Sequence, residues 1–230
     1  MPCRVSSSGA FDSAGQRCSA LRVLFVQDGI ANRVVKMLAG AMEELIVGDP
    51  SDIRTDIGPV IDAEALAMLR DHAARMGAEG KLIARSPVAS RAEGYFFAPH
   101  AFEIDSIQRL KRETFGPILH VVRYRADRLN AVCEAINATG YGLTLGIHTR
   151  IASSADEIAA RVKAGNIYVN RNQIGAVVEA QPFGGEGLSG TGPKAGGPHY
   201  LHRFALERTL SVNTTAAGGN ASLLSLGDTG

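Results

Sequence analysis

The recurrence of apolar residues along the chain constrains its fold more than any other feature. Short apolar runs of strand length alternate with apolar stripes at helical spacing. The expected strands cover residues 21–26, 81–84, 118–124, 143–148 and 166–169. The expected helices cover residues 30–45, 62–76, 127–138 and 153–162. This alternation is typical of domains with parallel strands and crossover helices, so we predict an α/β fold with a mainly parallel sheet.

The charge balance and hydropathy of the chain exclude two classes of partner. The 230 residues include 24 Lys and Arg against 23 Asp and Glu, and the net charge is +1. These charges are scattered, so we expect neither nucleic acid nor a membrane surface as a partner. The longest apolar runs are far shorter than the roughly 20 residues of a membrane span. The first residues contain no apolar signal segment, so we expect a cytoplasmic protein.

The three cysteines, Cys3, Cys18 and Cys133, form neither a CxxC motif nor a Cys/His cluster. We therefore expect free thiols and no metal site. Cys133 lies in a helical stripe and suits the core, where a free cysteine acts as a small hydrophobic residue. Cys18 could also be a buried core residue of this kind. However, it directly precedes the first strand, and the adjacent cation of Arg17 favours the thiolate, so Cys18 is a candidate nucleophile.

A second candidate segment, ETFGP, lies just before the strand expected at residues 118–124. The Glu113 carboxylate could accept hydrogen bonds from the hydroxyls of a ribose. The alternative is a surface glutamate in the charged run at residues 111–113. Phe115 could equally be a core residue.

A glycine-rich loop at residues 185–190 reads GEGLSG and so matches GxGxxG. We reject a dinucleotide-binding turn here, because that motif needs a strand before it and a helix after it. Pro182 precedes the loop and TGPKAGGP follows it. Backbone N–H groups of such a loop could bind a small anion such as a carboxylate. A flexible surface loop is the alternative.

Six segments together resemble a known family. AGQRCSA, DIGP, ETFGPIL, YGLTLGI, GNIYVN and PFGGEGLSGTGPKAGGP occur in the order found in aldehyde dehydrogenases. GEGLSGTGPKAGGP and LSVNTTAAGGNASLLSLG resemble in particular the L-glutamate γ-semialdehyde (1-pyrroline-5-carboxylate) dehydrogenase module of bifunctional proline utilization A. The resemblance implies a three-layer αβα catalytic domain over residues 11–213 with a C-terminal oligomerisation strand. Residues 1–10 match poorly, and residues 214–230 form a polar tail.

The resemblance also implies a reaction, a cofactor and residue roles. The reaction is the NAD(P)-dependent oxidation of L-glutamate γ-semialdehyde to L-glutamate in proline catabolism. Cys18 would be the catalytic nucleophile, Glu113 would bind the nicotinamide ribose of NAD, and Phe115 would pack against the nicotinamide. The residues expected to contact the substrate carboxylate are Arg17, Ser19, Ser189 and Gly190.

A complete module of this family has two domains and is roughly twice as long as this chain. We therefore expect the nucleotide-binding half to be absent, and this chain alone to be inactive. An alternative is a non-catalytic fragment that acts as an interaction module with full-length subunits. It would pair through the alternating segment at residues 209–213 as part of a homo-oligomer. A third possibility is a cysteine hydrolase, but none of the six histidines lies in a recognisable signature.

Overall fold

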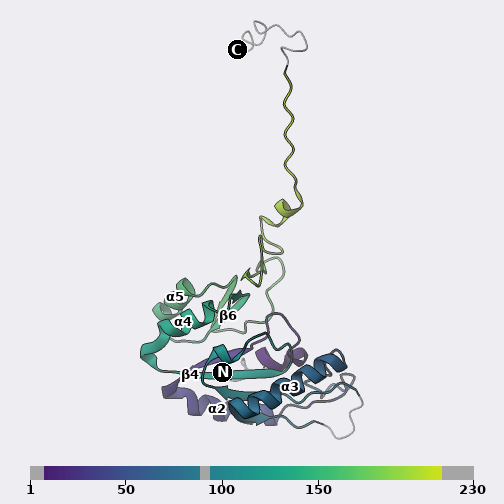
Figure 1. Ribbon diagram of the computed structural model, residues 1–230, viewed down its shortest axis with the longest axis vertical. Coiled ribbons are helices and arrows are strands. Elements are labelled where there is room, and N and C mark those ends of the chain that lie inside the picture. The colour runs from purple at the N-terminus through teal and green to yellow at the C-terminus, as the bar shows by residue number, and fades with distance from the viewer. Residues whose placement is uncertain (1–7, 89–93, 214–230) are drawn as a thin grey trace. The chain divides into compact units, whose positions relative to one another are not determined.

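The computed structural model describes residues 8–88 and 94–213 (Figure 1). The chain divides into two compact units, residues 1–197 and residues 198–230. The predicted polar tail at residues 214–230, the first seven residues and therefore Cys3 lie outside the described residues.

The first unit is built on a four-stranded sheet with the strand order β1-β4-β3-β2. These strands are β1 (Val23–Gln27), β4 (Ile118–Tyr124), β3 (His100–Ile104) and β2 (Lys81–Arg85). β4 pairs in parallel with β1 and with β3, whereas β2 pairs antiparallel with β3. The sheet is therefore mainly parallel, and the predicted fold class is confirmed.

Two long helices, α2 (Asp28–Glu43) and α3 (Ala63–Glu79), pack on this sheet. α3 begins where predicted, because the Asp62 side chain accepts a hydrogen bond of 2.8 Å from the Ala65 amide and so caps the helix. The first five residues of β4 are all buried. Successive strand residues point to opposite faces, so both faces of β4 are covered, as a three-layer αβα domain requires.

The later part of the first unit contains shorter elements. Its strands form two small sheets, β6 with β7 in parallel and β5 with β8 antiparallel. Cys133 lies in α4 with 3 % of its surface exposed, so its predicted core position is confirmed. The elements of this part are η2 (Ile107–Arg109), η3 (Ala126–Arg128), α4 (Leu129–Asn137), β5 (Tyr141–Gly142), β6 (Thr144–Ile147), α5 (Ala152–Arg161), β7 (Asn166–Val169) and β8 (Glu186–Gly187).

One prediction needs correction, and another stays untested. The sequence prediction omitted β3, a short strand that follows directly after Pro99. In the second unit, the structure has the short helix η4 (Tyr200–Phe204) but no strand over residues 209–213. Leu210 and Val212 are exposed in the single chain, and the predicted oligomerisation strand, which would need a second subunit, stays a prediction. Among the described residues, no helix has the length and apolar character needed to cross a membrane.

Candidate active site

Cys18 is exposed and lies at the end of an unusual turn. The turn begins with η1 (Asp12–Gly15), in which Ser13 and Ala14 adopt left-handed φ angles of 57° and 54°. Gly15 continues the left-handed conformation with a φ of 64°. Such a conformation costs about 1–3 kcal/mol for a residue other than glycine, and it persists only where the surrounding structure enforces it. The chain therefore holds the turn before Cys18 in a defined shape.

Gln16 fixes this turn from one side. Its Oε1 atom accepts a hydrogen bond of 2.8 Å from the Ile61 amide, and its Nε2 atom donates to the Pro59 carbonyl at 3.4 Å. Residues 56–59 are the DIGP motif of the sequence. This motif thus supports the turn that presents Cys18.

Arg22 joins the Cys18 turn to the ETFGP segment. Its guanidinium donates hydrogen bonds to four acceptors, two in the Cys18 turn and two in the ETFGP segment. These acceptors are the carbonyl oxygens of Gly15 at 2.7 Å and Arg17 at 3.2 Å, the carbonyl oxygen of Gly116 at 3.0 Å, and Glu113 Oε1 at 3.2 Å. A planar guanidinium can serve several acceptors at fixed angles, so Arg22 sets the spacing between the two segments.

The surroundings of Arg22 keep it in place and charged. Its side chain is 17 % exposed, and its guanidinium carbon lies 4.8 Å from the centre of the Phe115 ring. Burial lowers the pKa of Arg22, while the nearby Glu113 carboxylate raises it. The guanidinium starts so far above neutral pH that it remains a cation. The sequence does not single out Arg22, because its contacts with Glu113 and Gly116 span 91 and 94 positions.

Glu113 and Phe115 present a carboxylate and an aromatic ring on the exposed side of the same segment. The Glu113 side chain is 41 % exposed and Phe115 is 40 % exposed, whereas Thr114 between them is 4 % exposed. An acceptor for hydroxyl groups beside a flat apolar surface fits a ribose with an attached aromatic base. These two residues could therefore hold the nicotinamide riboside part of NAD(P).

The structure places the other predicted residues in two groups. Arg17 and Ser19 flank Cys18, but the Arg17 Nε atom donates to Ser13 Oγ at 2.9 Å, and Ser19 is buried. Ser189 and Gly190 lie in a turn against β5, where Ser189 Oγ accepts a hydrogen bond of 3.1 Å from the Gly142 amide. Contacts with Arg22 bring Arg17, Glu113 and Phe115 together at the Cys18 turn. The contacts made by Ser189 and Gly190 join them to β5 and β8 instead.

The glycine loop at residues 185–190 has the form expected from sequence. It contains the two-residue strand β8 followed by a turn, and no helix begins between residues 188 and 197. The dinucleotide-binding interpretation, which requires a helix there, is excluded as predicted.

Comparison with known proteins decides the family. The sequence profile described as "Aldehyde dehydrogenase family" matches residues 3–210. This chain belongs to the aldehyde dehydrogenase family. "Bifunctional protein PutA" from Klebsiella aerogenes is 53% identical over 208 residues, which cover 87% of this chain and 16% of that protein. "1-pyrroline-5-carboxylate dehydrogenase" from Geobacillus sp. (strain WCH70) is 34% identical over 206 residues, which cover 89% of this chain and 39% of that protein.

Solved structures agree with this family assignment. A crystal structure of a Proline Utilization A (PutA) variant from Bradyrhizobium japonicum has a TM-score of 0.87 and 59% identity, and the match covers 94% of this chain and 22% of that one. A structure of a 1-pyrroline-5-carboxylate dehydrogenase has a TM-score of 0.80 and 34% identity, with coverage of 88% and 39%. This aldehyde dehydrogenase chain thus spans less than half of the length of these relatives.

Proposed function

We propose that this chain carries the nucleophile and the nicotinamide-facing surface of an NAD(P)-dependent aldehyde dehydrogenase. Its reaction would be the oxidation of L-glutamate γ-semialdehyde to L-glutamate in proline catabolism. The observation that carries the proposal is the Arg22 bridge, because it holds the turn before Cys18 beside Glu113 and Phe115. The relatives named PutA and 1-pyrroline-5-carboxylate dehydrogenase support the choice of substrate.

Cys18 would act as the nucleophile. Its thiolate would add to the aldehyde carbon, and loss of hydride from that carbon would leave a thioester on Cys18 for water to hydrolyse. The exposure of Cys18 at the end of a rigid turn suits attack on a small molecule. Rigid placement lowers the entropic part of the barrier, because the reacting atoms are already oriented.

Glu113 and Phe115 would hold the cofactor beside this carbon. When bound, NAD(P)+ supplies the hydride acceptor. The Glu113 carboxylate would accept hydrogen bonds from the ribose hydroxyls, and the Phe115 ring would pack against the nicotinamide. Arg22 would keep both side chains at one distance from the Cys18 turn. The main nucleotide-binding domain is expected outside this 230-residue chain, which would be inactive alone.

The substrate carboxylate would be bound by Arg17, Ser19, Ser189 and Gly190. The Arg17 Nε atom donates to Ser13, and the terminal N–H groups of the same guanidinium would donate to the substrate carboxylate. An enzyme that hydrogen-bonds a substrate group discriminates strongly against analogues that lack it, because its buried donors are then left unpaired. Short aldehydes that carry a carboxylate would thus be preferred over simple aliphatic aldehydes.

The second unit suggests a subunit contact as an additional proposal. Its exposed apolar side chains between residues 201 and 212 are Leu201, Phe204, Leu206, Leu210 and Val212. Exposed apolar side chains concentrated in one segment often mark an interaction site. We propose that the segment at residues 209–213 adds as a strand to a second subunit of a homo-oligomer.

Substrate choice can be tested in a chimera in which this chain replaces the matching segment of the Geobacillus relative. We expect kcat/KM for glutamate γ-semialdehyde to exceed that for butanal by about 10⁴. Ser19→Ala should lower only the value for the semialdehyde. Equal kcat/KM values for the two aldehydes would refute carboxylate binding, and an unaffected Ser19→Ala variant would remove that residue from the site.

A further inference from the structure

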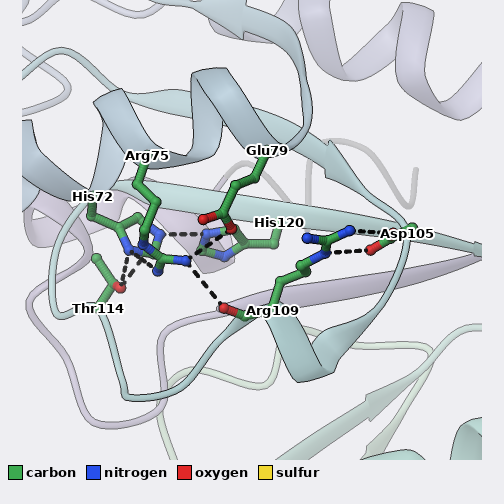
Figure 2. Close-up of polar contacts among 7 residues, drawn as sticks. All are labelled: His72, Arg75, Glu79, Asp105, Arg109, Thr114 and His120. Atoms are coloured by element: carbon green, nitrogen blue, oxygen red, sulfur yellow. Dashed lines mark hydrogen bonds and ion pairs between the residues drawn. The ribbon is translucent and has the colours of Figure 1, made fainter.

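Two buried histidines, His72 and His120, lie in contact with each other, and His72 also contacts Thr114 of the ETFGP segment (Figure 2). His72 on α3 is 8 % exposed, and His120 on β4 is 1 % exposed. Their Nε2 atoms are 2.9 Å apart, and the rings meet edge to face at an interplanar angle of 87°. Two ring nitrogens at this distance share one hydrogen, so one must donate and the other accept.

The partners at both ends assign the hydrogens. His120 Nδ1 lies 3.0 Å from the Arg22 carbonyl oxygen, which can only accept, so Nδ1 carries the hydrogen. His120 Nε2 then accepts from His72 Nε2, and His72 Nδ1 is left with a lone pair. Arg75 Nη2, which can only donate, lies 3.2 Å from that Nδ1 atom. The assignments from the two ends agree.

Both rings are neutral in this arrangement. The pKa of His72 is lowered to about 3 and that of His120 to about 4, with burial as the largest cause in both. For His72, the charges of His120, Arg75 and Arg112 add to this lowering, whereas for His120 the bond to the Arg22 carbonyl partly opposes it. An added proton on either ring would place two N–H groups against each other or against Arg75. At neutral pH the chain of hydrogen bonds therefore has one direction.

The chain ends at Thr114. The Thr114 hydroxyl lies against the His72 ring, 3.1 Å from Nδ1 and 3.5 Å from Nε2. Nδ1 carries no hydrogen in this arrangement, so the hydroxyl is the donor toward Nδ1, which also accepts from Arg75. Thr114 is buried although its neighbours Glu113 and Phe115 are exposed. Thr114 therefore attaches the segment that carries Glu113 and Phe115 to the protein interior. The other end, the Arg22 carbonyl, belongs to the residue whose guanidinium bridges the two site segments.

The base of this network is also fixed. The Arg75 guanidinium that contacts His72 also donates to Glu79 Oε2 at 3.1 Å and to the Arg109 carbonyl at 3.2 Å (Figure 2). Arg109 in turn forms an ion pair of 2.8 Å with Asp105. α3 and the loop after β3 therefore hold His72 in one orientation, and His72 transmits that orientation to Thr114.

We propose that Thr114, His72 and His120 are positioning residues, whose hydrogen-bonded chain fixes Glu113 and Phe115 relative to Arg22 and the Cys18 turn. This inference rests on the proposed cofactor role of Glu113 and Phe115. None of the three positioning residues is required to touch the substrate or cofactor. Thr114 acts through the placement of its neighbours, and the histidines act through Thr114.

The direction of the chain can be tested on the 230-residue protein without any enzymatic assay. Nitrogen-15 spectra of the histidine rings at pH 7.5 should show His72 as the neutral Nε2–H tautomer and His120 as the neutral Nδ1–H tautomer. Substitution of each histidine in turn by glutamine assigns the signals. The opposite tautomers, or a charged ring at this pH, would overturn the proposed direction.

The positioning role can be tested with a fluorescent reporter, because the chain contains no tryptophan. Phe115→Trp makes position 115 the sole tryptophan, and acrylamide quenching then reports how firmly the segment is held. Thr114→Val, which keeps the shape but loses the hydroxyl, should increase quenching, and Thr114→Ser should restore it. Should the valine variant fail to fold, His72→Gln provides the same comparison. Quenching that is unchanged in a folded Thr114→Val or His72→Gln protein would overturn the role.

The active chimera adds a readout that general destabilisation would not give. Thr114→Val should raise KM for NAD+ about fivefold, the effect of one lost hydrogen bond, with kcat little changed. Thr114→Ser should restore KM. If the parent chimera is active, an unchanged KM in Thr114→Val would overturn the inference. An inactive parent chimera would instead count against the proposed function, and the spectroscopic tests of the positioning role would still apply.

Discussion

Gly15 packs so closely on Gly116 that a Cβ atom at position 15 would lie 2.3 Å from the Gly116 carbonyl oxygen. Gly15 also has a φ of +64°, which side chains other than glycine's rarely adopt. This contact between the Cys18 turn and the ETFGP segment therefore requires glycine at position 15.

Replacement of Gly15 should consequently destabilise the fold. We expect Gly15→Ala to lower the free energy of unfolding by at least about 1–3 kcal/mol, because the backbone strain alone has that magnitude. Urea denaturation measures this change. Gly40→Ala in α2 is the matched control, since its added Cβ would have no atom within 4 Å apart from its own stretch of helix. That control should be stabilising by about 1 kcal/mol. Equal stability of the two variants would contradict the close contact.

Arg22 should be irreplaceable by lysine. Arg22→Lys keeps the charge but cannot serve four acceptors with the geometry of a guanidinium. In the active chimera we expect kcat/KM to fall by about tenfold or more, since charge-assisted hydrogen bonds are lost. Arg125→Lys is a suitable control, because the ion pair of Arg125 with Asp127 is 74 % and 60 % exposed. Full activity of the Arg22→Lys chimera would show that the bridge is not needed.

The two described thiols should differ in reactivity. Cys18 is exposed, whereas Cys133 is buried and burial raises its pKa. A thiol reacts as its thiolate, so brief treatment with iodoacetamide near neutral pH should label Cys18 before Cys133. Peptide mapping by mass spectrometry quantifies both sites, and Cys18→Ser provides the blank. Faster labelling of Cys133 would contradict the positions assigned to the two residues.

The buried histidine pair should make stability depend on pH. The native pKa values of about 3 for His72 and about 4 for His120 lie below the ordinary histidine value of about 6.5. As the pH falls below 6.5, the unfolded chain gains protons that the native chain does not bind, so the free energy of unfolding decreases. The charged side chains that act on the pair are those of Arg75, Arg112 and Arg22.

Each histidine should contribute a slope of about 1.4 kcal/mol per pH unit below pH 6. Urea denaturation between pH 7.5 and 5 measures the total slope. His72→Gln should lower the stability at pH 7.5 and make the slope shallower, because one of the two titrating groups is gone. Identical slopes for the parent and this variant would show that His72 is not held neutral in the native protein.

Much of the fold was predictable because local patterns determine it. β4 and β7 begin and end at the predicted residues, where apolar runs follow Pro117 and Gly165. β3 was omitted because five residues with a glutamate among them give a weak pattern. Arg22 and the pairing of His72 with His120 were not predictable. Their distant partners lie 48 to 98 positions away. The parallel pairing of β1 with β4 brings Arg22 to His120, and the packing of α3 brings His72 to His120.

The proposed subunit contact depends on the last described residues. Leu210 is 80 % exposed and Val212 is 68 % exposed in the single chain. A chain that ends at Glu207 should therefore lose any dimer seen by sedimentation, because the added strand and its apolar side chains are removed. Leu210→Ser with Val212→Ser should weaken the dimer while leaving the backbone in place. An unchanged distribution of species would remove this contact.

The most direct test of the central claim is the rate of NADH formation by the chimera with glutamate γ-semialdehyde, compared among the parent, Cys18→Ala and Cys133→Ala. The parent and Cys133→Ala should form NADH at similar rates. Cys18→Ala should be slower by at least about 10³-fold, as expected when a covalent nucleophile is removed. Retention of activity in a folded Cys18→Ala chimera would contradict the assignment of Cys18 as the nucleophile.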